Sequence, residues 1–276
     1  MTNDTQRVLL GDEAIAQGAL DAGISGCYAY PGTPSTEIME FIQASSQAAE
    51  RGVHRDWSCN EKTAMEEALG MSFAGLRTLV RMKHVGLNVA ADGFVNSAIT
   101  GVHGGLVLTV ADDPSMHSSQ NEQDSRFYAE FAGVPLFEPG DQQEAYDLLR
   151  EAFELSESLQ TPVVVRLTTR LAHSRANVTV RPPLAQNEKR FPERARRFVL
   201  LPAIARREYA NLIDKQPKLL DASERSPVNV RRDGPDRSLG IIACGITRNY
   251  LNELFRDAPC PHPVLEIRQY PVPKKA

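Results

Sequence analysis

Hydrophobic and polar residues alternate in two rhythms along most of the chain, from residue 8 to about residue 170. Segments such as residues 11–22 carry apolar side chains three and four positions apart, which is typical of helices with one buried face. Between them lie short, almost continuously apolar runs, including residues 106–110 and 162–167, which indicate strands covered on both faces. The alternation predicts βαβ units in a doubly wound parallel α/β sheet.

The same pattern predicts where ligands bind. Further strands are expected at residues 27–30, 53–58, 79–82 and 134–137, and further helices at residues 37–46, 60–75, 89–99 and 142–155. In such sheets ligands bind beyond the carboxyl ends of the strands. The loops at those ends cover residues 31–35, 58–61, 83–88 and 112–126. These loops are therefore the first candidates for a functional site.

The regular pattern ends near residue 175, which divides the chain into three predicted parts. Residues 1–175 are expected to form the doubly wound domain. Residues 176–238 are rich in Arg, Lys and Pro with one apolar island, and they predict an extended arm with a solvated basic face. Residues 239–276 hold one strand–helix–strand pattern, which is too small to bury a core alone. We expect this last part to be an incomplete second α/β unit.

Composition excludes several classes of protein. The chain has 276 residues, 42% hydrophobic and 24% charged, which is ordinary for a globular protein. Its formal net charge of -4 gives no general attraction to nucleic acid or to anionic membranes. Apolar runs stay shorter than the roughly 18 residues that a membrane helix needs, and the first seven residues lack the features of a secretion signal. We therefore expect a cytoplasmic protein.

The cysteines indicate a reducing compartment. Cys27, Cys59, Cys244 and Cys260 include no C-x-x-C pair, so free thiols are expected. Their spacing also excludes an iron–sulfur cluster of ferredoxin type on this chain.

One acidic residue at a predicted helix start draws attention. In Trp57-Ser-Cys-Asn-Glu-Lys62, Asn60 is placed to cap a helix and Glu61 takes its first position. The positive end of the helix dipole stabilises a carboxylate there. On spacing alone, Glu61 therefore has either a purely structural role or a chemical one.

The polar stretch after the fourth predicted strand offers further candidates, each with a plainer alternative. Asp112 and Asp113 suit a Mg²⁺ ion, but with Pro114 next they equally suit a cap and turn at the strand end. His117 beside Ser118–Ser119 suggests a base and nucleophile, although sequence neighbours rarely face each other in that way.

Three basic residues are also open to two interpretations. His84 suits acid–base chemistry near neutral pH or an ordinary hydrogen bond. Lys83 and Arg126 suit recognition of a substrate carboxylate, but they equally suit ion pairs with Asp124 or Asp112.

Several familiar catalytic motifs do not occur. The sequence contains no G-x-G-x-x-G, P-loop, H-E-x-x-H or G-x-S-x-G motif. The G-D-G pattern that precedes the Mg²⁺-diphosphate ligands of thiamine enzymes is broken at Gly140-Asp141-Gln142, and no paired Asn follows. No metal site is predicted on this chain.

Six segments resemble motifs of the indolepyruvate:ferredoxin oxidoreductase alpha subunit, and the likeness is continuous from about residue 8 to residue 207. These segments are Tyr30-Pro-Gly-Thr-Pro-Ser35, Trp57–Lys62, Met82–Asp92, Ala111–Arg126, Arg166–Arg175 and Phe198–Ala203. The resemblance implies a pyrimidine-binding domain of a thiamine diphosphate enzyme in the 2-oxoacid:ferredoxin oxidoreductase superfamily. It also implies that the C-terminal part begins a domain of the transketolase C-terminal type.

The resemblance assigns a chemical role to Glu61. In the wider family a Glu contacts N1′ of the aminopyrimidine and favours the imino tautomer, whose N4′ removes the C2 proton. The implied cofactor-binding residues are Pro31, Gly32, Thr33, Asn60, Glu61, Lys83, His84, Val85, Gly86 and Asn88. The implied substrate-binding residues are Thr33, Ser118, Ser119, Gln120 and Arg126.

The sequence also departs from the family pattern, because family alpha subunits continue into a diphosphate-binding domain and commonly a ferredoxin-like tail. We therefore expect a hetero-oligomer in which a partner chain supplies Mg²⁺, the diphosphate ligands and the iron–sulfur clusters. The chain is then either a natural split subunit or a fragment of a longer polypeptide. Gly32 favours the aryl-pyruvate type of enzyme over the pyruvate type.

The implied reaction is oxidative decarboxylation of a 2-oxoacid to an acyl-coenzyme A, with electrons passed to ferredoxin. Two alternatives remain open at this point. One is a non-oxidative thiamine-dependent 2-oxoacid decarboxylase, and the other is a non-catalytic structural or regulatory subunit with the same fold.

Overall fold

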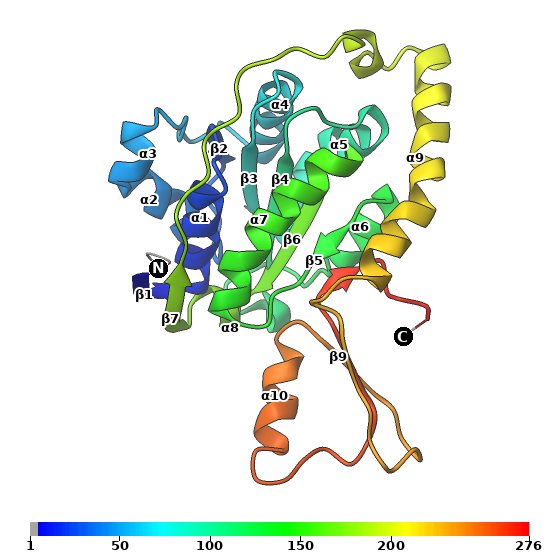
Figure 1. Cartoon of the computed structure of the whole chain (residues 1–276). Coiled ribbons are helices and arrows are strands. Elements are labelled where there is room, and N and C mark those ends of the chain that lie inside the picture. Colours follow the sequence, from blue (N-terminus) through cyan, green and yellow to red (C-terminus); the bar gives the residue numbers. More distant parts are fainter. Residues whose placement is uncertain (1–4, 276) are drawn as a thin grey trace.

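Figure 1 shows the computed structural model, which describes residues 5–275. A six-stranded sheet in the order β11-β5-β6-β4-β3-β2 lies at its centre. Its parallel strands are β2 (Gly26–Ala29), β3 (Thr78–Lys83), β4 (Leu106–Asp112), β5 (Leu136–Phe137) and β6 (Val163–Thr168). β11 (Gln269–Tyr270) pairs antiparallel with β5 at one edge. The predicted doubly wound α/β fold is confirmed.

Helices cover both faces of this sheet, because neighbouring strand residues point to opposite sides. Leu79 and Val107 enter one core with α1 (Gly11–Asp21), α2 (Thr36–Ala44) and α7 (Gln142–Leu159). Val80 and Leu108 enter the other core with α4 (Glu61–Phe73), α5 (His84–Thr100) and α6 (Arg126–Ala132). All residues of β3 and β4 are buried, as the apolar run of β4 predicts and although β3 contains Arg81 and Lys83.

Short elements complete the doubly wound part. β1 (Thr5–Leu10) pairs antiparallel with β7 (Arg175–Val180) beside the main sheet. α3 (Ser46–Glu50) follows α2, and α8 (Thr169–Ala172) follows β6. The strand expected at residues 53–58 is wrong as a continuous strand, since only His54 and Trp57 form isolated bridges to β2. Polar side chains at residues 54–56 prevent a continuous buried strand there.

The predicted loop at residues 83–88 is also wrong, because α5 begins at His84, directly after β3. Gly86 and Asn88 are weak helix formers, which hid the helix start in the sequence. Leu87 and Phe94 are fully buried and anchor the helix against the sheet. Tertiary packing therefore overrides local propensity at this point.

The extended arm predicted for residues 176–238 needs a correction. Residues 181–201 are extended apart from a single turn of 3₁₀-helix, but α9 (Pro202–Glu224) is a helix of 23 residues that runs along one side of the molecule (Figure 1). It buries Leu212 and Leu219, two side chains seven positions apart, while most of its other residues are exposed or partly exposed. So narrow an apolar stripe, with Pro217 inside it, gave no clear helical pattern.

The C-terminal part forms a small separate sheet next to the main one (Figure 1). It contains β8 (Val230–Arg232), β9 (Ile241–Cys244), α10 (Thr247–Leu254) and β10 (Val264–Ile267), in the strand order β8-β10-β9. β9 and β10 run parallel, as the strand–helix–strand pattern predicts. Residues 1–4 and 276 of the predicted parts lie outside the described residues. Among residues 5–275, no helix is both long enough and apolar enough to span a bilayer.

Candidate functional site

Three of the predicted site loops meet at the carboxyl edge of the sheet. β2 leads into residues 30–35, β3 leads into the first turn of α5, and β4 leads into residues 112–125. Glu61 reaches the same edge from the start of α4, since Trp57 bridges to the end of β2 just before it. The topology therefore gathers side chains from four separate stretches of sequence.

Glu61 occupies the first position of α4 and lies against α5. The Asn60 side chain caps this helix by accepting a hydrogen bond from the Thr63 amide at 2.8 Å, as predicted. The half-buried Glu61 carboxylate packs on Gly86, so that a Cβ atom at Gly86 would lie 2.6 Å from Glu61 Oε1. Only glycine fits at that position with Glu61 in its present place.

The loop that carries Thr33 is held by hydrogen bonds from a buried side chain, while Thr33 itself is exposed. Arg81 is fully buried and donates hydrogen bonds to the Tyr30 carbonyl at 3.0 Å and to Ser35 Oγ at 3.2 Å. Its guanidinium also stacks over the Trp57 ring at 4.5 Å. Burial lowers the pKa of Arg81 to about 10. The sequence analysis missed this residue, although an Arg inside an apolar strand was a signal for it.

Gly32 in the same loop packs on Lys83, whose Cδ would lie 3.2 Å from an added Cβ. Lys83 is buried, and its Nζ donates to the Ser118 carbonyl at 3.4 Å. His84 Nε2 lies 2.9 Å from the Asn121 carbonyl oxygen. These contacts tie the start of α5 to the loop after β4.

The predicted residue Asn88 makes the same kind of contact one turn later. Its Nδ2 donates to Gln123 Oε1 at 2.8 Å, and its Oδ1 accepts a hydrogen bond from the Tyr128 hydroxyl. Val85 lies beside these residues in the first turn of α5 and is partly exposed. The predicted cofactor and substrate residues of α5 and of the β4 loop therefore form one connected surface.

Asp113 organises the loop after β4 rather than standing free for a metal. Its carboxylate accepts hydrogen bonds from Ser119 Oγ at 2.6 Å, from the Ser118 amide at 2.9 Å and from Thr169 Oγ1 at 2.8 Å. Burial opposes ionisation, but these hydrogen bonds outweigh it and hold the pKa of Asp113 well below its usual range. The turn-forming alternative is thus the one that the geometry supports.

Arg126 is paired within the chain. Its Nη2 lies 2.6 Å from Asp124 Oδ2 and its Nη1 lies 3.6 Å from Glu138 Oε2. The hydrogen bond to Asp124 raises the pKa of Arg126 above its usual range. This is the ion-pair alternative for Arg126. A contact to a substrate carboxylate requires the guanidinium to exchange one of these partners.

The pair belongs to a larger buried network that sequence reasoning missed. Arg166 in β6 lies with its Nε 2.6 Å from Asp112 Oδ2, and its Nη1 contacts Glu138. Burial raises the pKa of Asp112 against the attraction of Arg166. An Arg within the apolar run of β6 was the only sequence signal for this network.

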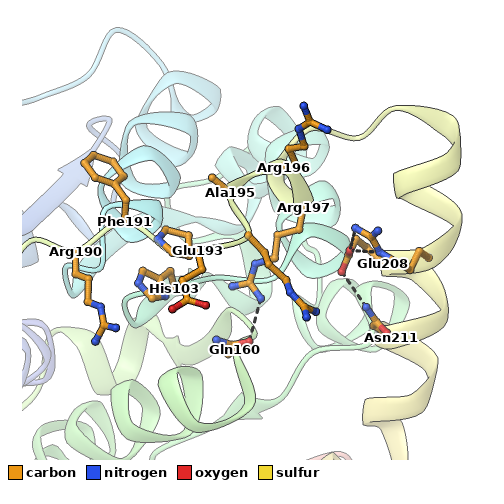
Figure 2. Close-up of a pocket in the computed structure, with 13 residues that line it drawn as sticks. His103, Gln160, Arg190, Phe191, Glu193, Ala195, Arg196, Arg197, Glu208 and Asn211 are labelled. Atoms are coloured by element: carbon orange, nitrogen blue, oxygen red, sulfur yellow. Dashed lines mark hydrogen bonds and ion pairs between the residues drawn. The ribbon is translucent and has the colours of Figure 1, made fainter.

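One cavity borders the carboxyl edge of the sheet, and a larger one lies away from it. One of about 430 Å³ lies at the carboxyl edge between the β4 loop and α10, and its lining includes His117, Thr169 and Tyr250. A larger one of about 1090 Å³ lies at the opposite edge, between the arm and α9 (Figure 2). Its residues His103 and Gln160 precede β4 and β6, so it is remote from Glu61. Gln120 and His117 of the predicted set are exposed on the β4 loop.

The chain matches a family of known proteins over most of its length. A family model described as "Pyruvate flavodoxin/ferredoxin oxidoreductase, thiamine diP-bdg" matches residues 17–214. The "Indolepyruvate oxidoreductase subunit IorA" of Thermococcus kodakarensis is 45% identical over 252 residues, which are 89% of this chain and 39% of that protein. The protein of the same name from Methanothermobacter thermautotrophicus is 42% identical over 268 residues, 96% of this chain and 43% of that protein.

More distant relatives share the fold. The "2-oxoglutarate synthase subunit KorA" of Methanothermobacter marburgensis is 26% identical over 193 residues, 66% of this chain and 50% of that protein. A solved structure of 2-oxoglutarate:ferredoxin oxidoreductase from Magnetococcus marinus superposes with a TM-score of 0.76 at 17% identity, covering 97% of this chain and 55% of that one. The chain thus spans 39–43% of the length of the two indolepyruvate oxidoreductase subunits compared above.

Proposed function

This chain belongs to the pyruvate flavodoxin/ferredoxin oxidoreductase family of thiamine diphosphate-binding domains, and we propose that it supplies the half-site for the aminopyrimidine ring. The contact between Glu61 and Gly86 carries this proposal. It leaves a half-buried carboxylate at the carboxyl edge of the sheet, where ligands of such folds bind. The resemblance of the surrounding motifs to indolepyruvate oxidoreductase subunits supports the same role.

The residues present fit the pyrimidine half of the cofactor. Bound thiamine diphosphate supplies the carbanion chemistry that 2-oxoacid decarboxylation requires. With the cofactor bound, Glu61 would hold the ring nitrogen and exchange a proton with it through its carboxyl group. Thr33 is exposed above this edge and offers a hydroxyl to the substrate.

The diphosphate half is proposed to come from elsewhere. Asp113 already accepts several hydrogen bonds and Asp112 is paired with Arg166, so neither offers a free set of oxygens to Mg²⁺. The chain also spans well under half the length of its indolepyruvate oxidoreductase relatives. We therefore assign Mg²⁺, the diphosphate ligands and the iron–sulfur clusters to polypeptide outside this sequence, either a partner chain or a continuation of the same chain.

The proposed reaction is oxidative decarboxylation of an aryl 2-oxoacid such as indolepyruvate. One 2-oxoacid, one coenzyme A and two oxidised ferredoxins give an acyl-coenzyme A, carbon dioxide, a proton and two reduced ferredoxins. The names of the relatives at 45% and 42% identity support this substrate class. Arg126 is the proposed partner of the substrate carboxylate, together with Ser118, Ser119 and Gln120.

The test compares Glu61→Gln with Glu66→Gln, each in the complex of this chain with its partner polypeptides. The complex is purified from the cells that naturally produce it. Turnover is followed as indolepyruvate- and coenzyme A-dependent reduction of methyl viologen. Loss of the proton-transferring carboxylate is expected to lower turnover by about 10²-fold or more. Glu66 is an exposed acid one turn further along α4, so its variant is expected to match the wild type.

Unchanged turnover in Glu61→Gln contradicts the assignment of the half-site. Analysis of the products separates the reaction classes. An acyl-coenzyme A supports the oxidative reaction, whereas an aldehyde formed without dye reduction contradicts it.

A further inference from the structure

A polar cluster beside the loop of residues 30–35 lies outside the residues assigned above to cofactor and substrate. It is buried at Asp12 and Arg81 and partly exposed at Glu37 and His173. It joins Asp12 in the first turn of α1, Glu37 in the first turn of α2, Arg81 in β3 and His173 after α8. Asp12 is fully buried. Within residues 5–275, no donor reaches either of its side-chain oxygens, nor the buried Oε2 of Glu37. A buried acceptor without a donor destabilises the fold. The cluster therefore lacks a hydrogen-bond donor when both carboxyl groups are ionised.

The two carboxyl groups lie within hydrogen-bond reach of each other. Two ionised carboxylates at that separation repel, whereas a single proton between them turns one oxygen into a donor for the other. Burial raises the pKa of Asp12 well above its usual range, and the charge of Glu37 adds to this effect while Arg81 opposes it. His173 Nε2 lies 3.6 Å from the other oxygen of Glu37 and is partly exposed.

The charges around the cluster decide between a proton and a metal ion. Carboxylate and imidazole atoms of Asp12, Glu37 and His173 lie within 4.8 Å of one another, which is also compatible with a cation site. Arg81 contributes one buried positive charge. Two carboxylates with Arg81 sum to -1, one shared proton brings the sum to 0, and a divalent ion in its place brings it to +1. A neutral state has the lowest free energy in a buried site, which favours the proton over the divalent ion.

The other titratable groups near the cluster do not change this balance. Glu13 is engaged as a capping residue, since its carboxylate accepts from the Leu10 amide at 2.8 Å. Glu40 in α2 is exposed, so its charge is largely screened by solvent. Burial raises the pKa of the Cys27 thiol to about 12, so it stays neutral beside Arg81.

We propose that Asp12 and Glu37 share one proton, and that this carboxyl pair with Arg81 holds the loop of residues 30–35 in position. Arg81 is the link, because the charges of Asp12 and Glu37 act on its guanidinium, which donates hydrogen bonds to the Tyr30 carbonyl and to Ser35 Oγ. Asp12, Glu37 and Arg81 are then positioning residues for Thr33. Only this last step rests on the proposed function, whereas the shared proton is a property of the chain alone.

The first test measures melting temperature against pH for Asp12→Asn in the isolated chain. A carboxyl group whose pKa is raised by folding stabilises the fold at low pH and loses this contribution as pH rises through its folded pKa. The Asn amide donates to Glu37 at every pH. The variant is therefore expected to melt higher than the wild type by an amount that grows by about 3 °C or more between pH 5 and pH 9.

Three comparisons make the result specific. Glu37→Gln is expected to behave like Asp12→Asn, because either amide replaces the shared proton. Asp12→Ala is expected to melt lower than the wild type, because Glu37 then keeps a buried oxygen without a donor. Asp257→Asn, at an 88% exposed acid, is expected to differ from the wild type by less than about 1 °C.

The second test observes the proton directly by carbon NMR of the protein labelled at aspartate carboxyl carbons. One signal at neutral pH is expected to show the shift of a protonated acid and to vanish in Asp12→Asn. Mg²⁺, Mn²⁺ and Zn²⁺ are added in turn to the wild type, to Asp12→Asn and to His173→Ala. If a metal ion raises the melting temperature of the wild type but of neither variant, a metal site is established and the proposal is overturned. A difference in melting temperature between Asp12→Asn and the wild type that does not change with pH also overturns the proposal.

Positioning of the loop is tested by hydrogen exchange at residues 32–36. Faster exchange is expected in Asp12→Ala but not in Asp12→Asn, and equal rates in both contradict the positioning role. In the complex, Asp12→Ala is expected to raise the KM for the 2-oxoacid more than it lowers kcat, with rescue by Asn. The experiments on the isolated chain need no turnover, so their outcome is separate from that of the proposed function.

Discussion

Gly86 sets the distance between the proposed catalytic carboxylate and the start of α5. Replacing it with Ala places a methyl group 2.6 Å from Glu61 Oε1, so the carboxylate must move. We expect turnover of the complex to fall by about 10²-fold, since small displacements at a reacting group have effects of that size. The measurement is kcat in viologen reduction, with the melting temperature recorded in parallel.

Gly70 provides the matched control for this substitution. It lies in α4, the same helix as Glu61, and an added Cβ there meets nothing within 4 Å. Gly70→Ala is therefore expected to stabilise the chain by about 0.5–1 kcal/mol through helix propensity, with unchanged kcat. Equal activities for Gly86→Ala and Gly70→Ala would mean that the contact with Glu61 is not functional.

Asp113 contributes to the free energy of unfolding, and this contribution changes with pH in the opposite direction to that of Asp12. Its folded pKa is depressed, so its stabilisation is present above the unfolded pKa of about 3.9 and is lost as pH falls toward the folded pKa. Asp113→Asn is expected to cost about 1–3 kcal/mol at pH 7, with a gap to the wild type that narrows below about pH 4. Urea unfolding from pH 7 to pH 3 measures this gap, and a constant gap contradicts the assignment.

Among the elements, α9 depends on very few buried side chains. Leu212 is 6% exposed and joins the core formed by α4, α5 and α6. Leu212→Ala is expected to destabilise the chain by about 2–4 kcal/mol in urea unfolding and to speed proteolysis within residues 202–224. Its neighbour Ile213 is 51% exposed, and Ile213→Ala is expected to cost less than about 1 kcal/mol. Equal effects of the two variants would show that α9 does not dock.

The elements also show what the sequence can and cannot predict. Strands such as β4 were predictable because burial on both faces requires an almost unbroken apolar run. The start of α5 and the whole of α9 were not, because contacts with other elements stabilise them more than their own residues do. The motif loops predicted a site at the carboxyl edge of the sheet, and the structure brings the loops after β2, β3 and β4 together there. The pairing of Arg166 with Asp112 and the cluster of Asp12 with Glu37 and His173 join distant positions, which no local pattern reveals.

At the scale of the whole molecule, the C-terminal unit is fastened beside the proposed half-site. β11 leaves that unit and pairs with β5 of the main sheet. Arg248 in α10 and Arg268 after β10 each lie 2.8 Å from Glu144 at the start of α7. These links fasten α10 to the start of α7, while Thr33, Asn60 and Asn88 at the edge around Glu61 stay exposed.

Because this edge is exposed, we expect cofactor binding to be divided between this chain and further polypeptide. If Mg²⁺ and the diphosphate are held elsewhere, the isolated chain is expected to show no tight binding of Mg²⁺ with thiamine diphosphate by calorimetry, and no dye reduction. The complex is expected to bind both and to lose turnover reversibly when EDTA removes Mg²⁺. In Glu61→Gln the complex should still bind Mg²⁺ and cofactor while turnover is lost, because Glu61 contacts the ring and not the diphosphate. Dye reduction by the isolated chain, or loss of Mg²⁺ binding in Glu61→Gln, would contradict this division of the site.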